Sequence, residues 1–193
     1  MTTCMEHELT KGKVIVLLAR GFEEVDVSAV TRILRGSGLS VSVVGLTAGP
    51  VRGAYGLSLV ADCALGDVDT ELPQAAVLPG GIQATRRFSA EPRVHTLLRQ
   101  VVDGQGYVMA IDTSRTVLRS AGVLGTREAA RSNGSARGRF EKPVMRWHGG
   151  ESPLDGLEGL PCERVRVEGR VILSQGSDSA EEAALTLASM LEG

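Results

Sequence analysis

The fold is decided by residues 13–26, which read Lys13-Val-Ile-Val-Leu-Leu-Ala-Arg-Gly-Phe-Glu-Glu-Val-Asp26. The apolar run through Ala19 is too short for a helix and rich in β-branched residues, which predicts a strand buried on both faces. A turn follows at Gly21, and Glu23 and Glu24 open a helix where their carboxylates oppose the positive end of the helix dipole. A buried strand that turns sharply into a helix is typical of an α/β sheet.

The rest of the chain repeats this alternation of short apolar runs and helical patterns. A hairpin is predicted between Gly49 and Ala64. Further strands are predicted at Ser40–Leu46, Ala75–Leu78, Tyr107–Ile111, Glu163–Glu168 and Arg170–Ser174. Helices are predicted at Pro92–Asp103, Ser114–Ala121 and Ser179–Leu191. In the last helix, Ser179 and Glu182 have the spacing of a capping box. The pattern favours a mostly parallel sheet with helices on both faces, and residues 125–161 receive no assignment.

Composition excludes several classes of protein. The 193 residues carry a formal net charge of -2, from 21 Lys+Arg and 23 Asp+Glu, so we expect no binding to nucleic acid or to an anionic membrane. No apolar run approaches the ~20 residues that cross a bilayer. The three cysteines, Cys4, Cys63 and Cys162, lie far apart without metal-type spacing, which favours a reducing cytoplasm over a disulfide framework. We therefore expect a cytoplasmic protein with no metal and no cofactor.

This length fits one domain, which we place at residues 13–193 after a polar N-terminal extension at residues 1–12. In α/β folds the reactive positions follow the carboxyl ends of the strands. Three such ends carry polar residues or glycines, namely Gly21–Asp26, Pro79–Gly81 and Asp112–Arg115.

Asp112 follows the strand Tyr107–Ile111 and directly precedes a helix. A residue in such a tight turn presents its side chain to solvent, as in a nucleophile elbow, and the N–H groups of the helix start favour an anion. The plainer interpretation is that Asp112 caps the helix, alone or with Thr113 or Ser114. On the residues alone, the helix-cap interpretation is favoured.

Five segments occur in the order found in one known family: Val14–Asp26, Val43–Leu46, Val77–Gly81, Val108–Asp112 and Val171–Ser177. From Lys13 onward the chain therefore resembles the ThiJ/PfpI superfamily. The resemblance implies a flavodoxin-like three-layer sandwich of the class I glutamine amidotransferase-like type. It also implies a homodimer and a role in stress responses.

The chemistry of that family needs a cysteine at the elbow, an acidic side chain after the first strand and commonly a histidine. The resemblance places Asp112 at the cysteine position, Asp26 at the acidic position and Arg131 near the histidine position. None of His7, His95 and His148 falls there.

The resemblance also implies a ligand-binding turn. Gly80 and Gly81 match the Pro-Gly-Gly turn whose N–H groups form the family's oxyanion pocket. Thr113 and Arg131 complete the ligand-binding residues that we expect, for a small polar or anionic ligand.

Because the cysteine is missing, several functions are possible. A carboxylate attacks carbonyls far less readily than a thiolate, so hydrolase, glyoxalase or deglycase chemistry should be lost or weakened. In one hypothesis Asp112 mimics a cysteine oxidised to sulfinate, and the protein binds ligands or regulates. In another, Asp26 and Asp112 share a proton and catalyse hydration or isomerisation. Residual glyoxalase or deglycase activity, and a pocket without a ligand, are further alternatives.

Overall fold

The computed structural model describes residues 13–68, 72–124 and 164–192. The described residues belong to one compact unit. The predicted N-terminal extension and the unassigned residues 125–161 lie outside the described residues, and the boundaries of the predicted domain stay a prediction.

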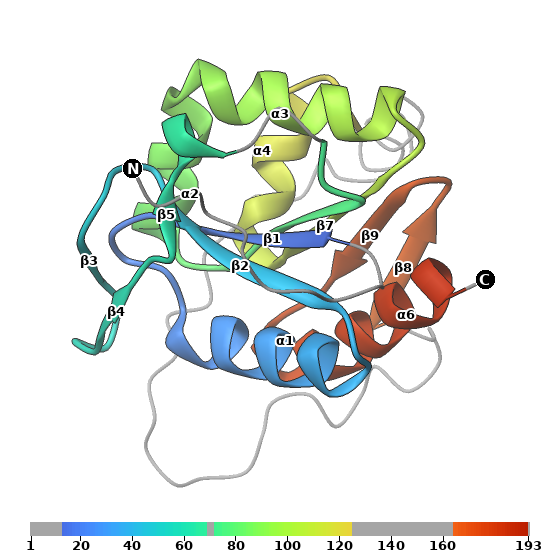
Figure 1. Ribbon diagram of the computed structural model, residues 1–193, viewed down its shortest axis with the longest axis horizontal. Helices are drawn as coiled ribbons and strands as arrows, with labels where there is room; N and C mark the ends of the chain where they lie inside the picture. Colours follow the sequence, from blue (N-terminus) through green and yellow to red (C-terminus); the bar gives the residue numbers. More distant parts are fainter. Residues whose placement is uncertain (1–12, 69–71, 125–163, 193) are drawn as a thin grey trace, which may run out of the picture. The chain divides into compact units, whose positions relative to one another are not determined.

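The central sheet has seven strands, of which only the edge strand β8 is antiparallel to its neighbour (Figure 1). Their order across the sheet is β5 (Cys63–Ala64), β2 (Ser40–Gly45), β1 (Lys13–Leu18), β6 (Ala75–Leu78), β7 (Tyr107–Ile111), β9 (Val171–Ser174) and β8 (Val165–Glu168). The order β2-β1-β6-β7-β9 is the flavodoxin-like order of a doubly wound sheet. The predicted fold class is therefore confirmed.

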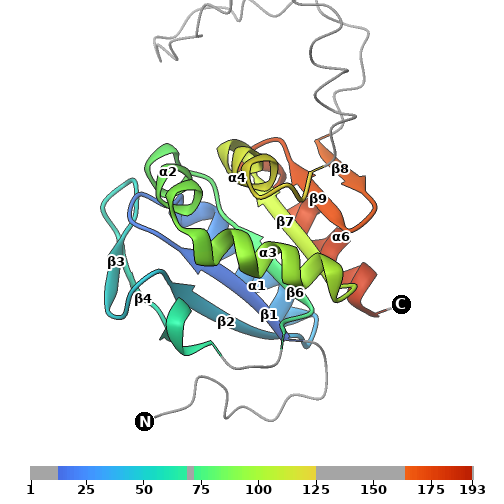
Figure 2. The same cartoon turned by 90° about the horizontal axis from the view of Figure 1, so that it is seen from above.

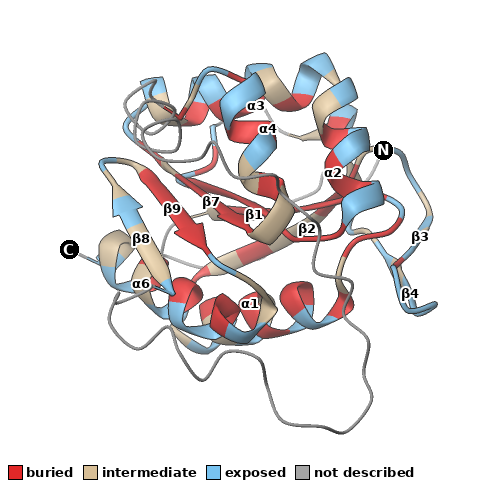
Figure 3. Cartoon of the chain, turned by 180° about the vertical axis from the view of Figure 1, so that it is seen from behind, coloured by how far each residue is buried: buried red, intermediate tan, exposed pale blue. Residues whose placement is uncertain are grey.

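Five helices of the described residues cover the two faces of the sheet. One face carries α1 (Glu24–Gly36) and α6 (Ala180–Glu192), and the other carries α2 (Ile82–Ala90), α3 (Pro92–Asp103) and α4 (Arg115–Ser120). Figure 3 shows the buried strands between helices whose outer faces are exposed. Short 3-10 turns occur at η1 (Leu65–Asp67), η2 (Asp112–Ser114) and η3 (Ser177–Ser179).

The core explains why the apolar runs become strands. Val16, Val77, Met109 and Ile172 lie side by side across β1, β6, β7 and β9, and none of the four is exposed to solvent. Side chains buried on both faces of a parallel sheet need no alternation with polar residues. The central strands are thus continuous apolar runs.

Two predictions of secondary structure need correction. The sequence predicts no helix at α2, because this segment has few large apolar residues besides Phe88 and so no clear apolar stripe. The hairpin is confirmed as β3 (Pro50–Arg52) paired with β4 (Ser58–Val60), but Cys63 and Ala64 leave it and join the central sheet beside β2. Figure 2 shows this hairpin outside the sheet.

The predicted capping box is wrong. The Ser179 hydroxyl donates to the Gly176 carbonyl at 2.9 Å and accepts from the Gly176 N–H at 3.2 Å. This serine therefore closes the turn before α6, and it leaves Glu182 out of the cap.

The topology places a crevice at the ends of β1 and β6. These strands are neighbours, yet β1 continues to β2 on one side and β6 continues to β7 on the other. Loops that leave in opposite directions open a space at the carboxyl ends of the strands. Separately, no helix in the described part of the chain is long and apolar enough to cross a membrane.

Candidate functional site

Asp112 occupies a strained turn at the end of β7. Its φ is +50°, in the left-handed region that residues other than glycine rarely adopt. No hydrogen bond within the described ranges reaches its carboxylate, and the side chain of Ser114, at the N-cap of α4, makes no capping bond either. The helix-cap interpretation therefore does not describe Asp112, whose side chain is half-buried.

Three hydroxyl groups fix this elbow to the glycine turn that follows β6. Ser114 Oγ donates to the carbonyl of Pro79 at 2.5 Å. Thr85 Oγ1, on α2, lies 3.1 Å from Ser114 Oγ and 2.9 Å from Thr113 Oγ1. The Thr113 side chain, which we expected at the ligand, bonds to α2, and its predicted role in ligand binding stays a prediction.

Asp26 is buried in the first turn of α1, with no solvent exposure. Its Oδ2 accepts the Gly80 N–H at 2.7 Å, whereas no partner within hydrogen-bond distance of its Oδ1 is found among the described residues. Burial raises the pKa of Asp26, and the nearby charge of Asp112 adds to this effect. The Ser177 side chain and the Gly80 N–H favour the charged form and offset part of the rise.

Gly80 separates the acidic side chains of the site. A Cβ added to it would lie 2.9 Å from Asp26 Oδ2, 3.4 Å from Glu23 Cγ and 3.6 Å from Asp112 Cβ. The two aspartates predicted from the sequence are therefore brought to the same glycine. Asp112 raises the pKa of Asp26 through its charge, not through a hydrogen bond.

The two glycines of the turn have different roles. The Gly80 N–H is bound to Asp26 and so is not free to stabilise an oxyanion. No hydrogen bond between described residues uses the Gly81 N–H. Gly81 has φ +108°, and a Cβ on it would overlap the Gly21 carbonyl oxygen, so only glycine fits this contact between loops.

Glu23 is a site residue that the sequence analysis treated only as a helix start. Burial raises the pKa of Glu23, and the charges of Asp26, Glu24 and Asp112 raise it further. Its neighbour Glu24 has a structural role, because its Oε1 accepts the N–H groups of Tyr55 at 2.9 Å and Leu57 at 3.2 Å. The sequence feature that could have identified both residues is the run of carboxylates after β1. The partners of these carboxylates come from distant loops.

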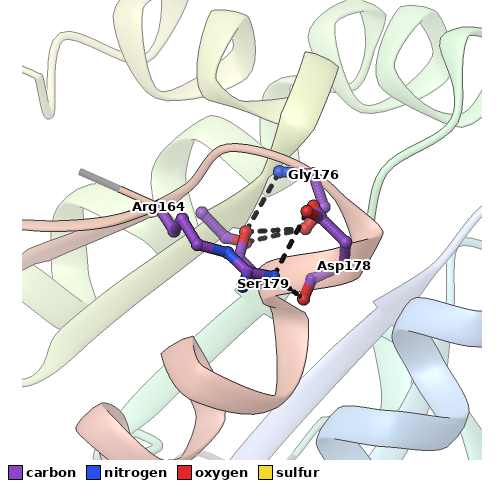
Figure 4. A network of polar contacts seen from close by, with 5 residues as sticks. Arg164, Gly176, Asp178 and Ser179 are labelled. Atoms are coloured by element: carbon purple, nitrogen blue, oxygen red, sulfur yellow. Dashed lines mark hydrogen bonds and ion pairs between the residues drawn. The ribbon is translucent and has the colours of Figure 1, made fainter. Parts of the chain in front are cut away.

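A polar network supports the loop that carries Ser177 (Figure 4). Arg164 donates to the carbonyl and to the carboxylate of Asp178, and the Ser179 hydroxyl lies 2.8 Å from that of Ser174. These bonds tie the start of β8 and the end of β9 to η3. They thereby fix the position of Ser177 beside Asp26.

A cleft of about 370 Å³ opens beside this cluster. Its walls include Arg20, Gly21, Glu23, Arg52 and Gly81, but neither of the predicted aspartates. Glu23 is the acidic side chain common to the cleft and to the group around Gly80. Sequence reasoning missed the cleft because Arg52 reaches it from the β3–β4 hairpin, which folds back onto the loop after β1.

Arg131 lies outside the described residues, so its predicted place near the ligand stays a prediction. Within 13–68, 72–124 and 164–192, no group of three or more His, Cys, Asp or Glu side chains is arranged to hold a metal ion. Cys63 is disulfide-bonded, although the spacing of the cysteines favoured a reducing cytoplasm over a disulfide framework.

Comparisons with known proteins agree with this fold. The model of the DJ-1/PfpI family matches residues 12–190. Protein dj-1beta of Drosophila melanogaster is 28% identical over 180 residues, which cover 93% of this chain and 89% of the relative. The glutathione-independent glyoxalase DJR-1.2 of Caenorhabditis elegans is 29% identical, covering 95% of this chain and 90% of the relative. The crystal structure of Drosophila DJ-1beta superposes with a TM-score of 0.74 at 25% identity, covering 94% of this chain and 91% of that one.

Proposed function

The chain belongs to the DJ-1/PfpI family, and we propose that it binds a small polar or anionic ligand beside Asp112 without the cysteine-dependent turnover that the resemblance implies. The observation that carries the proposal is the φ of +50° at Asp112. The backbone has the strained turn of a nucleophile elbow, although the side chain there is a carboxylate. A conformation of this kind costs about 1–3 kcal/mol and persists where the surroundings require it.

In this proposal the carboxylate of Asp112 stands in for an oxidised cysteine. A sulfinate and an aspartate are both short anionic groups that accept hydrogen bonds. The Asp112 carboxylate accepts no bond from another described residue, so its oxygens remain available to a ligand or to a regulatory partner. The carboxylate is encoded in the sequence, whereas a sulfinate forms only when a cysteine is oxidised.

The experiment is an assay of carbonyl consumption by the wild-type protein. Methylglyoxal is a suitable probe because one relative is named a glyoxalase. We expect methylglyoxal to disappear at the same rate with the wild-type protein as in buffer alone. Saturable consumption by the wild type would overturn the proposal.

A second candidate function is acid–base catalysis, which the raised pKa values of Asp26 and Glu23 favour. A carboxylate with a raised pKa can take a proton from the carbon beside a carbonyl and return a solvent proton to it. The wild type would then exchange the C–H protons of hydroxyacetone with D2O faster than buffer does, and Asp26→Asn would abolish the acceleration. Equal rates with and without protein would refute this candidate.

We also infer a homodimer, with contact through an exposed apolar patch at the start of α1 and the tip of the hairpin. This hairpin patch consists of Val25, Tyr55 and Leu57, which are 58%, 78% and 64% exposed. Glu24 binds the hairpin tip and so holds the three side chains together. Burying such a patch against a second copy removes apolar surface from water.

A further inference from the structure

The geometry points to an anion subsite formed by Arg20 and Arg52, which holds the carboxylate or phosphate group of a small organic ligand. This inference deepens the proposed ligand binding and rests on it. It assigns the charged end of the ligand to the cleft beside Glu23 and the rest of the ligand to the side of Asp112.

The backbone holds the two arginines at one cleft. The Gly21 N–H donates to the Arg52 carbonyl at 2.8 Å, and the Ala54 N–H donates to the Phe22 carbonyl at 2.8 Å. These two bonds join the loop after β1 to the end of β3. Arg20 and Arg52 consequently line the same cleft, although they are distant in the sequence.

Neither guanidinium group has a partner within the described part of the chain. Three other arginines do have one, in the ion pairs Arg32–Glu181, Arg93–Glu91 and Arg164–Asp178. Two guanidinium groups without partners at one cleft attract an anion. Guanidinium groups bind the paired oxygens of carboxylates and phosphates with particular geometric fit.

The other walls of the cleft narrow the class of ligand. Gly81 presents an N–H that no described residue accepts, which adds a donor for an oxyanion. The Glu23 carboxyl group, whose pKa is raised by burial, also lines the cleft and can form a hydrogen bond with a hydroxyl group next to the anionic group. A cleft of about 370 Å³ suits a small molecule. The ligand is thus a small organic oxyanion with a neighbouring oxygen.

The test is a titration followed by ¹H–¹⁵N NMR, with inorganic phosphate, acetate and the neutral acetamide as probes. We expect saturable shifts at the N–H groups of Gly21, Gly53 and Gly81 with at least one of the two anions and none with acetamide. The variant Arg20→Gln/Arg52→Gln should lower the affinity at least about tenfold, because each charged hydrogen bond is worth that much. The matched control Arg86→Gln/Arg119→Gln removes two exposed charges that do not line the cleft and should leave the affinity unchanged.

The outcomes separate this inference from the proposed function. Response to phosphate alone or to acetate alone supports the subsite and identifies which oxyanion it prefers. Absence of saturation with both anions, or equal affinity in the Arg20→Gln/Arg52→Gln variant, overturns the subsite. Neither result changes the methylglyoxal assay. Conversely, turnover of methylglyoxal by the wild type overturns the binding role and leaves the anion titration intact.

Discussion

Asp26 Oδ2 accepts the backbone N–H of Gly80 at 2.7 Å, and this bond joins the helix after β1 to the glycine turn after β6. It crosses the point where the sheet's connections diverge. Because of this bond, the Gly80 N–H is not free to stabilise an oxyanion, which is the role that the resemblance implies for it. Asp26 is therefore a buried residue that holds two loops of the site together. In contrast, no described residue donates a hydrogen bond to the carboxylate of Asp112.

The first prediction concerns the pH dependence of stability. Because the pKa of Asp26 is raised above its ordinary value of 3.8, the native state holds a proton that the unfolded chain has lost. Its contribution is complete below pH 3.8 and declines as the pH rises through the raised value. Relative to Asp26→Asn, the wild type should lose up to about 1.4 kcal/mol of unfolding free energy per pH unit in that window.

Urea denaturation of both proteins between about pH 4 and pH 7 checks this prediction. Asparagine keeps an acceptor for the Gly80 N–H, so the comparison isolates ionisation. A wild type that gains stability relative to Asp26→Asn as the pH rises would contradict the raised pKa.

Gly81→Ala should destabilise the fold by about 3 kcal/mol or more. The new Cβ would overlap the Gly21 carbonyl oxygen at a φ of +108°, so steric clash adds to backbone strain. Gly36→Ala is the control, because a Cβ there meets nothing within 4 Å. Denaturant midpoints measure both changes. A loss as small for Gly81→Ala as for Gly36→Ala would show that the two loops separate easily.

Glu24→Ala should loosen the hairpin and cost about 2 kcal/mol. It removes the acceptor of two backbone N–H groups, those of Tyr55 and Leu57. Hydrogen exchange should become faster at both amides. The comparison variant Glu181→Ala breaks only the exposed ion pair with Arg32 and should cost less than about 1 kcal/mol. Unchanged exchange in Glu24→Ala would mean that other contacts hold the hairpin.

Leu57→Lys should shift the protein from dimer to monomer. Leu57 is 64% exposed in the hairpin patch, and a charge at the centre of an apolar contact is costly to desolvate. Sedimentation equilibrium at several concentrations measures the change, with Leu185→Lys, at a 55% exposed position on α6, as the control. A wild type that sediments as a monomer at all concentrations would refute the dimer.

The strands could be predicted from sequence because their cause is local. Val16, Val77 and Met109 belong to short apolar runs, which are stable as strands when both faces are buried. Asp112 directly follows such a run, and Asp26 could be singled out beside it only through the family resemblance.

The rest of the site depends on contacts between distant segments. Helix α2 has few apolar residues, and the hydroxyl of Thr85 within it bonds to Ser114 beyond β7. Likewise, Arg52 lies at the cleft of Arg20 only because the hairpin returns to the loop after β1. Neither the periodicity nor the spacing of the sequence contains these pairings.

The most direct measurement is methylglyoxal consumption by the wild type, Asp112→Ala and Asp112→Cys, assayed side by side. If Asp112 replaces the nucleophile of an otherwise intact pocket, the wild type and Asp112→Ala will match the buffer, and Asp112→Cys will consume the substrate. Consumption by the wild type that disappears in Asp112→Ala would contradict this account, because it would make the carboxylate of Asp112 catalytic.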